Sequence, residues 1–382
     1  DRGLSLTQIE MLRSYLLSNI RPQDRNTAIK LYDDAIQSLL AVNTSAKSKL
    51  EFEFFKMYFR AQYAEDMSQG PGSTSDFVRI GKGFHRWVRE EETSLHLTDS
   101  DSYLKFIRRL ARYAEVFCKY HTILATRDTK EYLYLIVNGD YSFTLQPALI
   151  LAAVGEDDTD ETIIEKMKVI SKYLTKVLTW RVWNHWMISQ SSMEASIYNL
   201  CKAIRGMELN VLRDYLRSDP IELPELNNAP TLNQQNRNRL RVLLALITEI
   251  VASESGEPDY LLNKKEIEVE HIWSDHYEEH AAECTDMSDF VGVRNNLGDL
   301  LLLPKSFNAS YGDDTYEDKV VQYFSQNILA QTLNPLKYIN NPSFLAFKQR
   351  SGLTFQPYEH FLRANITERA ELYKAILKWN WQ

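Results

Sequence analysis

Apolar residues of this chain recur mostly at helical spacing. From Leu6 to Leu17, and again from Ala28 to Leu39, they fall three or four positions apart, so that each run presents one apolar face. Further runs predict helices over residues 51–63, 103–121, 144–154, 161–186, 236–252, 316–329, 342–349 and 367–379. The glycine- and proline-containing segment from Met67 to Thr74 is expected to be a loop. The pattern therefore predicts a mainly α-helical protein.

One stretch, from Glu266 to Asn308, breaks the helical pattern. Ile267 and Val269 alternate with glutamates, as in a half-buried strand, and the run ends in Glu270 and His271. Neighbouring residues of a regular strand point to opposite faces. Both side chains can therefore serve one site only where the strand ends or bulges.

A second short apolar run, Leu300 to Leu303, follows after a long loop and is stopped by Pro304. Proline is tolerated in the first turn of a helix. We therefore expect a strand, a long loop, a second strand and then a helix that carries Asn308 near its start. This order predicts a ββα metal-binding hairpin embedded in a helical domain.

The polar residues of such a hairpin suit phosphodiester hydrolysis. A neutral imidazole at His271 can take a proton from water. Glu270 and Asn308 offer hard oxygen ligands, which suit Mg²⁺ or Mn²⁺ with retained waters. The basic residues Arg294 and Lys305 flank the stretch and are candidates for phosphate contacts.

These residues resemble the HNH (His-Me finger) nuclease domain of GmrSD-type restriction proteins. The resemblance rests on Glu270-His271-Ile272, then Asn295-x-x-Gly298-x-Leu300-x-Leu302-Leu303, then Asn308. It extends over most of the chain, but its specific motifs lie between about Leu240 and Asn308. The opening, Asp1 to Leu6, is similar to the join at which an amino-terminal nucleotide-dependent domain passes into a helical region.

The resemblance implies a defence endonuclease that cuts modified foreign DNA, typically phage DNA, and a chain that lacks the nucleotide-dependent domain. His271 is then the general base, and Glu270 and Asn308 are the metal ligands. The resemblance also makes Asn295 a catalytic residue, which either organises the loop between the strands or assists at the metal. The sequence departs from the family pattern at Ser274, often proline there, and at Asp299, often asparagine. The second change is expected to put a negative charge near the phosphate path.

Composition and charge limit the remaining possibilities. The net charge is -8, so contacts to nucleic acid must come from local basic patches and not from the overall field. Three widely spaced cysteines and the lack of a long apolar run favour a cytoplasmic protein without a membrane span. The proline-rich segment 219–231 predicts a linker between a helical domain, 1–218, and a nuclease domain, 232–382. The oligomeric state is left open, a homo-oligomer included.

Two alternatives to the nuclease are kept. His276, His280 and Cys284 lie four residues apart and would share one face of a helix, where they could hold zinc. The chain could also be an inactive helical module that binds DNA or protein. Its interaction surface would then be the tryptophan stripe predicted on one helix, Trp180, Trp183 and Trp186.

Overall fold

The computed structural model describes residues 6–42, 49–70, 72–258, 261–264, 266–311 and 314–382, and the side chains of residues 308, 309 and 311 lie outside this description. Within it the chain is mainly helical, with a single two-stranded antiparallel sheet in the C-terminal region, so the predicted fold class is confirmed. No helix of the described part is long and apolar enough to cross a membrane.

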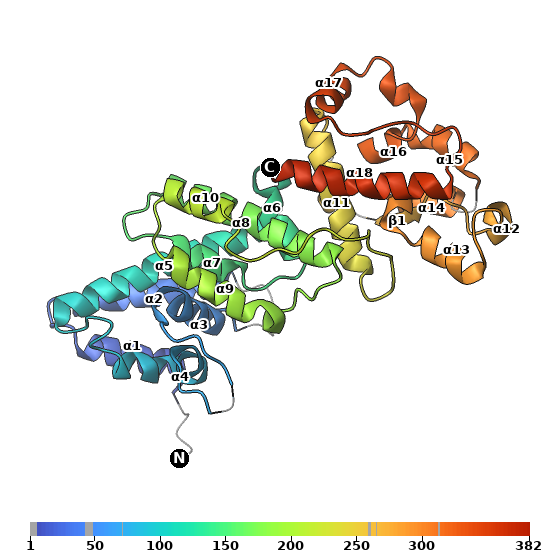
Figure 1. Ribbon diagram of the computed structural model, residues 1–382. Coiled ribbons are helices and arrows are strands. Elements are labelled where there is room, and N and C mark those ends of the chain that lie inside the picture. The colour runs from blue at the N-terminus through green and yellow to red at the C-terminus, as the bar shows by residue number, and fades with distance from the viewer. Residues whose placement is uncertain (1–5, 43–48, 71, 259–260, 265, 312–313) are drawn as a thin grey trace.

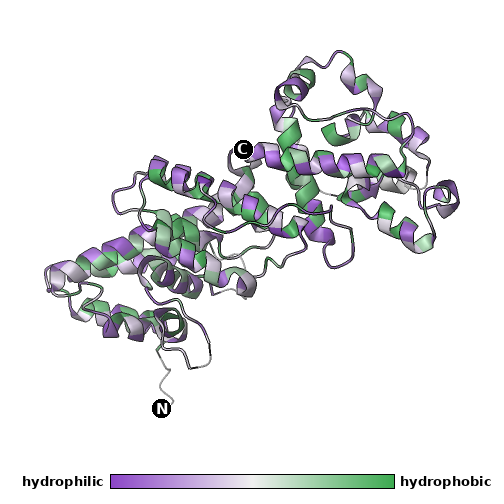
Figure 2. Ribbon diagram, in the orientation of Figure 1, coloured by the Kyte–Doolittle hydropathy of each residue, from purple (hydrophilic) through white to green (hydrophobic). Residues whose placement is uncertain are grey.

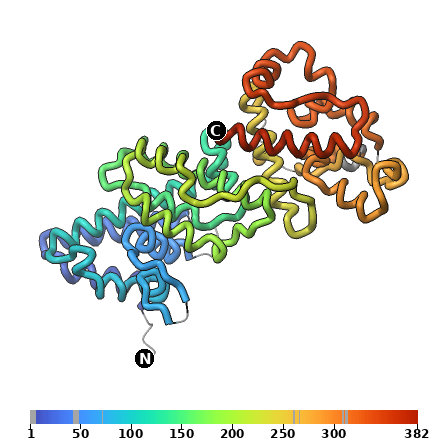
Figure 3. Tube along the Cα trace, viewed as in Figure 1, coloured from blue at the N-terminus to red at the C-terminus, as the bar shows by residue number. Residues whose placement is uncertain are grey.

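Figures 1 and 3 show two groups of helices, one formed by residues 6–217 and the other by residues 237–382. The first group is α1 (Gln8–Ser18), α2 (Arg25–Ala41), α3 (Leu50–Tyr63), α4 (Asp76–Glu90), α5 (Ser100–Thr126), α6 (Thr129–Asp140), α7 (Gln146–Ala153), α8 (Asp160–Trp183), α9 (Gln190–Ile204) and α10 (Leu209–Arg217). The second group holds α11 (Arg237–Glu254), η1 (Leu261–Asn263), β1 (Ile267–His271), α12 (Tyr277–His280), α13 (Met287–Arg294), η2 (Leu297–Asp299), β2 (Leu300–Pro304), α14 (Lys305–Tyr311), α15 (Tyr316–Tyr323), α16 (Ile328–Gln331), η3 (Pro335–Tyr338), α17 (Pro342–Ser351) and α18 (Arg363–Asn380).

The segment between the two groups, residues 219–231, forms neither a helix nor a strand, apart from an isolated bridge at Thr231. It is tied to the first group through Trp183, whose indole nitrogen donates to the Asn227 carbonyl at 3.1 Å. The predicted domain boundary at this segment stays a prediction.

Each group of helices is built around a helix that is apolar on nearly all sides. Every residue of α7 is buried, and so is every residue of α11 from Val242 to Ala252. Figure 2 shows the corresponding hydrophobic colour on both helices. α11 packs against α18, β2 and α16. A helix that is apolar all round is a core helix, and α11 is the one that supports the β-hairpin.

The predicted tryptophan stripe is only partly correct. α8 ends at Trp183, where the Asn184 side chain donates to the Trp180 carbonyl at 2.9 Å and His185 adopts a positive φ of 58°. Trp180 and Trp183 are therefore core residues, whereas Trp186 lies beyond the helix and is 45% exposed. A helix that stops at an αL residue cannot carry the stripe further.

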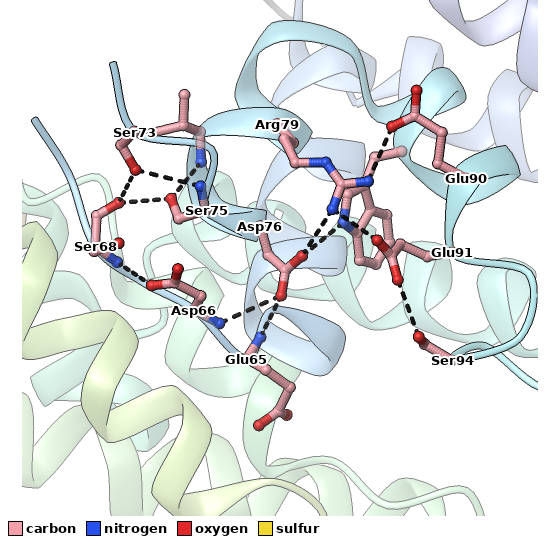
Figure 4. Close-up of polar contacts among 12 residues, drawn as sticks. Glu65, Asp66, Ser68, Ser73, Ser75, Asp76, Arg79, Glu90, Glu91 and Ser94 are labelled. Carbon is pink, nitrogen blue, oxygen red and sulfur yellow. Dashed lines mark hydrogen bonds and ion pairs between the residues drawn. The ribbon is translucent and has the colours of Figure 1, made fainter. Parts of the chain in front are cut away.

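The loop predicted from Met67 to Thr74 leads into α4, and its polar contacts are drawn in Figure 4. Ser75 caps the helix by accepting a hydrogen bond from the Val78 N–H at 3.3 Å. The Asp76 carboxylate accepts from the Glu65 N–H at 2.9 Å, which draws the end of α3 to the start of α4. These side chains replace the hydrogen bonds that backbone groups at helix ends lack.

The helix predicted over residues 316–329 is two helices, α15 and α16, because Asn327 starts a new one. Its Oδ1 accepts from the N–H groups of Leu329 and Ala330, and its Nδ2 donates to the Leu302 carbonyl at 2.6 Å. The break therefore attaches α16 to strand β2.

Candidate functional site

The β-hairpin fixes the candidate site. β1 pairs antiparallel with β2, with Ile267 opposite Pro304 and His271 opposite Leu300. Ile267 and Val269 are buried, as the alternation predicts. The strand ends at His271, and the next residue, Ile272, donates its N–H to the Asp299 carbonyl at 2.8 Å. The histidine thus stands at the point where the chain leaves the sheet.

His271 lies beside Asn295, the residue that follows α13. Its Nε2 is 3.1 Å from Asn295 Oδ1. The Asn295 Nδ2 donates to the Val291 carbonyl at 2.9 Å, which fixes the amide with its oxygen toward the imidazole. Because an amide oxygen only accepts hydrogen bonds, Nε2 carries the proton and Nδ1 keeps the lone pair. The structure therefore brings together two of the predicted site residues.

The half-buried position of His271 favours its neutral form. Burial, helped by the positive charges of Arg294 and Lys319, lowers the pKa of His271 to about 4, against a smaller opposing effect of the bond to Asn295. The imidazole is thus unprotonated over the neutral pH range.

Glu270 lies next to His271 on the strand, but its surroundings are different. Its side chain is buried, and its Oε1 lies 2.9 Å from the ammonium of Lys319, which is itself fully buried. The Lys319 Nζ also donates to the His271 carbonyl at 3.0 Å. The strand ends at His271, so the alternation of a regular strand does not fix the relative directions of the Glu270 and His271 side chains.

The other predicted site residues lie on the segments that flank the hairpin. Asn308 belongs to α14, but its side chain is outside the described residues. Lys305 is exposed at the start of α14. Arg294 binds the loop after β1, because its Nε donates to the Ser274 carbonyl at 3.0 Å and it pairs with Asp275 at 3.3 Å. The roles given to Asn308, Lys305 and Arg294 stay predictions.

The two departures from the family pattern have structural roles. The Ser274 hydroxyl donates to Glu279 at 2.6 Å. Asp299 is fully buried and accepts a hydrogen bond from the Trp273 N–H at 3.1 Å. Burial raises the pKa of Asp299 well above its ordinary value, which favours the neutral carboxyl. The burial of Asp299 and its raised pKa count against the expected negative charge near a phosphate path.

The glycine of the Asn-x-x-Gly motif is required by packing. Gly298 lies in η2, and a Cβ added there would come within 1.9 Å of the Ile366 carbonyl oxygen of α18. The motif thus lets the turn before β2 lie directly on the backbone of α18.

Among the described residues, no three His, Cys, Asp or Glu side chains gather as metal ligands, which counts against the zinc alternative. α12 is one turn long and ends at His280, so Cys284 does not continue its face. The His280 ring instead stacks on Trp273, with ring centroids 4.0 Å apart.

Lys319 is the residue of this site that the sequence pattern did not single out. It lies on α15 between Tyr316 and Tyr323, and all three are buried. The sequence did show a lysine at an apolar position of a helical stripe, which indicates a buried charge. It could not show that the partner of this lysine is Glu270, on a strand distant in the sequence.

The comparison with protein families concerns this same part of the chain. A model of the family described as "GmrSD restriction endonucleases, C-terminal domain" matches residues 217–372. The matched range contains the hairpin, His271, Asn295 and Lys319, and the helices α1 to α10 precede it. A search of the curated proteins finds no match to the chain. The resemblance of this part of the chain to the C-terminal domain of GmrSD restriction endonucleases is therefore confirmed.

Proposed function

We propose that residues 217–372, a GmrSD restriction endonuclease C-terminal domain, act as a metal-dependent HNH-type endonuclease on foreign or modified DNA in anti-phage restriction. The observation that carries this proposal is the contact between His271 Nε2 and Asn295 Oδ1, 3.1 Å apart at the end of β1. This contact fixes the tautomer of His271. The histidine lies in a domain whose family is described as restriction endonucleases.

In the proposed reaction, His271 Nδ1 takes a proton from a water molecule while the water oxygen attacks phosphorus. The bond from phosphorus to the leaving oxygen breaks, and that oxygen takes a proton from solvent. Asn295 keeps the imidazole in the required orientation, and the neutral imidazole is the form that accepts the proton. A positioned general base typically contributes about 10²- to 10⁴-fold in rate.

A divalent cation completes the proposal. Glu270 and Asn308 would hold Mg²⁺ or Mn²⁺, because carboxylate and amide oxygens are hard ligands and Mg²⁺ commonly takes only one or two of them from the protein. Such an ion neutralises charge on the phosphate and on the leaving oxygen. The Glu270 carboxylate already pairs with Lys319, so the ammonium and the metal are expected to compete for it.

The nuclease is tested by cleavage of supercoiled plasmid in Mg²⁺ or Mn²⁺. The wild type is compared with His271→Ala, Asn308→Ala and a matched control, His276→Ala, which removes an exposed histidine from the same loop. All four proteins are first checked for equal folding by circular dichroism. We expect metal-dependent nicking by the wild type and the control, and its loss in the other two. Nicking that survives in His271→Ala would remove the assigned base.

Metal binding has a separate test that needs no cleavage. A ligand that binds only the folded state raises the melting temperature. We expect Mg²⁺ to stabilise the wild type, and this stabilisation to be lost in Glu270→Gln and kept in Glu268→Gln. Glu268 lies two residues away on the same strand and face and is only partly buried. Equal stabilisation of both variants would exclude Glu270 as a ligand.

The alternative function, an inactive helical interaction module, gives different results. Neither His271→Ala nor Asn308→Ala would then change any cleavage, and Glu270→Gln would bind Mg²⁺ as the wild type does. DNA or protein binding would persist in all of these variants.

A further inference from the structure

Three arginines, Arg237, Arg239 and Arg241, lie in the first five residues of α11. Within the described part of the chain, their guanidinium groups have no ion pair and no hydrogen bond. Arg237 and Arg241 lie one turn apart on one side of the helix, where like charges destabilise it. No contact among the described residues compensates for this repulsion.

Several basic residues of α5 are paired with acidic side chains. On α5, which also carries several cations, Arg109 pairs with Glu156 at 2.9 Å and Arg112 with Asp160 at 2.6 Å. The three arginines have no acidic residue near them in the sequence. No Asp or Glu occurs between Glu225 and Glu249. The start of α11 is thus a positive surface in a chain of net charge -8.

A short series of direct contacts connects this surface to the candidate catalytic pair. The Leu232 N–H donates to the carbonyl of Asn295, the residue that contacts His271, at 2.7 Å. Thr231 forms a bridge with Asn296, and the Asn236 side chain donates to the Thr231 carbonyl at 2.8 Å. Asn236 directly precedes the first arginine, so these contacts place the start of α11 beside the turn that follows Asn295.

We propose that Arg237, Arg239 and Arg241 bind the phosphate backbone of DNA next to the bond that is presented to His271. This proposal rests on the proposed function. The guanidinium fork matches phosphate oxygens and stays charged at any working pH. Because the overall charge repels DNA, a local patch of this kind is what holds the substrate. Neighbouring amide side chains add hydrogen-bond donors of the kind that contact phosphates and base edges. Three of them precede the arginines and Asn238 lies between the first two arginines: Asn233, Gln234, Gln235 and Asn238.

Arg294, one of the two cations predicted from the motif, is less suited to this task. Arg294 already binds the Ser274 carbonyl and Asp275, and its side chain is 17% exposed. A phosphate contact by Arg294 would break bonds that hold the loop after β1, whereas the arginines of α11 have no such bonds to lose.

The test measures binding of a DNA duplex by fluorescence anisotropy over a range of salt concentrations. The His271→Ala variant of the whole chain is used throughout, so that the DNA stays intact. Arg237→Ala/Arg241→Ala is compared with Arg86→Ala/Arg89→Ala, a pair on α4 that is exposed and without an ion pair among the described residues. Each double variant loses two positive charges.

We expect the α11 variant to bind more weakly on every DNA sequence. Its slope of log K against log salt should be smaller by about 0.9 for each phosphate contact removed. The α4 variant should keep the affinity and slope of its parent. Equal effects in the two variants, an unchanged slope in the α11 variant, or no binding by the parent at any salt would each overturn the proposal.

The outcome is separable from that of the proposed function. Arginine-dependent DNA binding together with no metal-dependent nicking by the wild type would support the α11 surface and refute the nuclease. Nicking that depends on His271, together with an unchanged salt slope in the α11 variant, would support the nuclease and refute the surface.

Discussion

The ammonium of Lys319 lies 2.9 Å from the Glu270 carboxylate, and both groups are buried beneath the end of β1. The same ammonium donates to the His271 carbonyl at 3.0 Å. One lysine thus binds the side chain of one predicted site residue and the backbone of the next. The position of the candidate base therefore depends on a helix, α15, that begins 45 residues further along the chain.

Lys319→Met is expected to destabilise the protein strongly. The substitution removes the counter-ion of a buried carboxylate, and breaking a buried pair on one side typically costs about 3–5 kcal/mol of unfolding free energy. The double variant Lys319→Met/Glu270→Gln should be more stable than Lys319→Met alone, because the buried carboxylate that lost its ammonium is then replaced by a neutral amide. Urea unfolding of both variants measures this. A double variant that is no more stable than Lys319→Met would mean that the two side chains are not energetically coupled.

Asn295→Ala is expected to slow cleavage more than it affects folding. The amide fixes the tautomer and orientation of His271, and loss of such a supporting partner typically costs about 10- to 100-fold in activity or metal affinity. Asn295→Asp keeps an acceptor oxygen for Nε2 but loses the bond to the Val291 carbonyl, so its kcat should lie between those of the wild type and Asn295→Ala. Equal kcat values for all three proteins would show that the contact does not orient the base.

The folded protein is expected to lose stability in mild acid through His121. Its ring packs on Phe117, with ring centroids 4.6 Å apart, and burial lowers its pKa from 6.5 to about 4. Between these values the unfolded chain binds a proton that the folded chain does not. Stability that is present above pH 6.5 is therefore lost as the pH falls toward 4, by on the order of 1–3 kcal/mol.

The variant His121→Phe should show a smaller change in unfolding free energy between pH 7 and 4.5 than the wild type does, because phenylalanine keeps the ring contact without the titrating group. His276→Ala, at an exposed position, should show the wild-type change. If His121→Phe also retains the wild-type pH dependence, His121 is not the group responsible.

The hairpin could be predicted from the sequence because the residues that specify its strands lie close together in the chain. Alternation of Ile267 and Val269, a leucine run and a following proline suffice to predict two short strands, and the structure pairs them. The family motif singled out His271 and Asn295, but their contact was seen only in the structure. The buried pair of Glu270 and Lys319 could not be predicted, since it joins residues from a strand and a distant helix whose packing no local pattern contains.

The same distinction explains the errors. The helix over residues 161–186 was predicted too long because tryptophans fit helical spacing on either side of its end, whereas the end is set by the conformation of His185. Asp299 was expected to put a negative charge near the phosphate path, but a carboxyl next to a glycine turn gives no sign that it is fully buried. In both cases tertiary packing or a backbone conformation overrode a pattern that was locally consistent.

Gly298→Ala is expected to disrupt the site through a clash with the backbone of α18. A Cβ at this position would lie 1.9 Å from the Ile366 carbonyl oxygen and 2.8 Å from the Ala370 nitrogen. Both are backbone atoms of α18, which cannot move aside as a flexible side chain could. The turn before β2 must therefore shift, and overpacking of this kind typically costs about 1–3 kcal/mol or more. Since Asn295 lies just before that turn, the distance between its amide and His271 should change as well, and kcat should fall together with stability.

Gly292→Ala is the matched control for this prediction. Gly292 lies in α13, six residues earlier, and a Cβ there would meet no atom within 4 Å. Alanine favours an exposed helix over glycine by about 1 kcal/mol, so this variant should be slightly more stable than the wild type and should cleave normally. Thermal unfolding and plasmid nicking of the two variants give the comparison. A Gly298→Ala protein with wild-type melting temperature and activity would mean that the Asn-x-x-Gly turn does not lie directly on α18 in solution, and the packing role assigned to this glycine would be wrong.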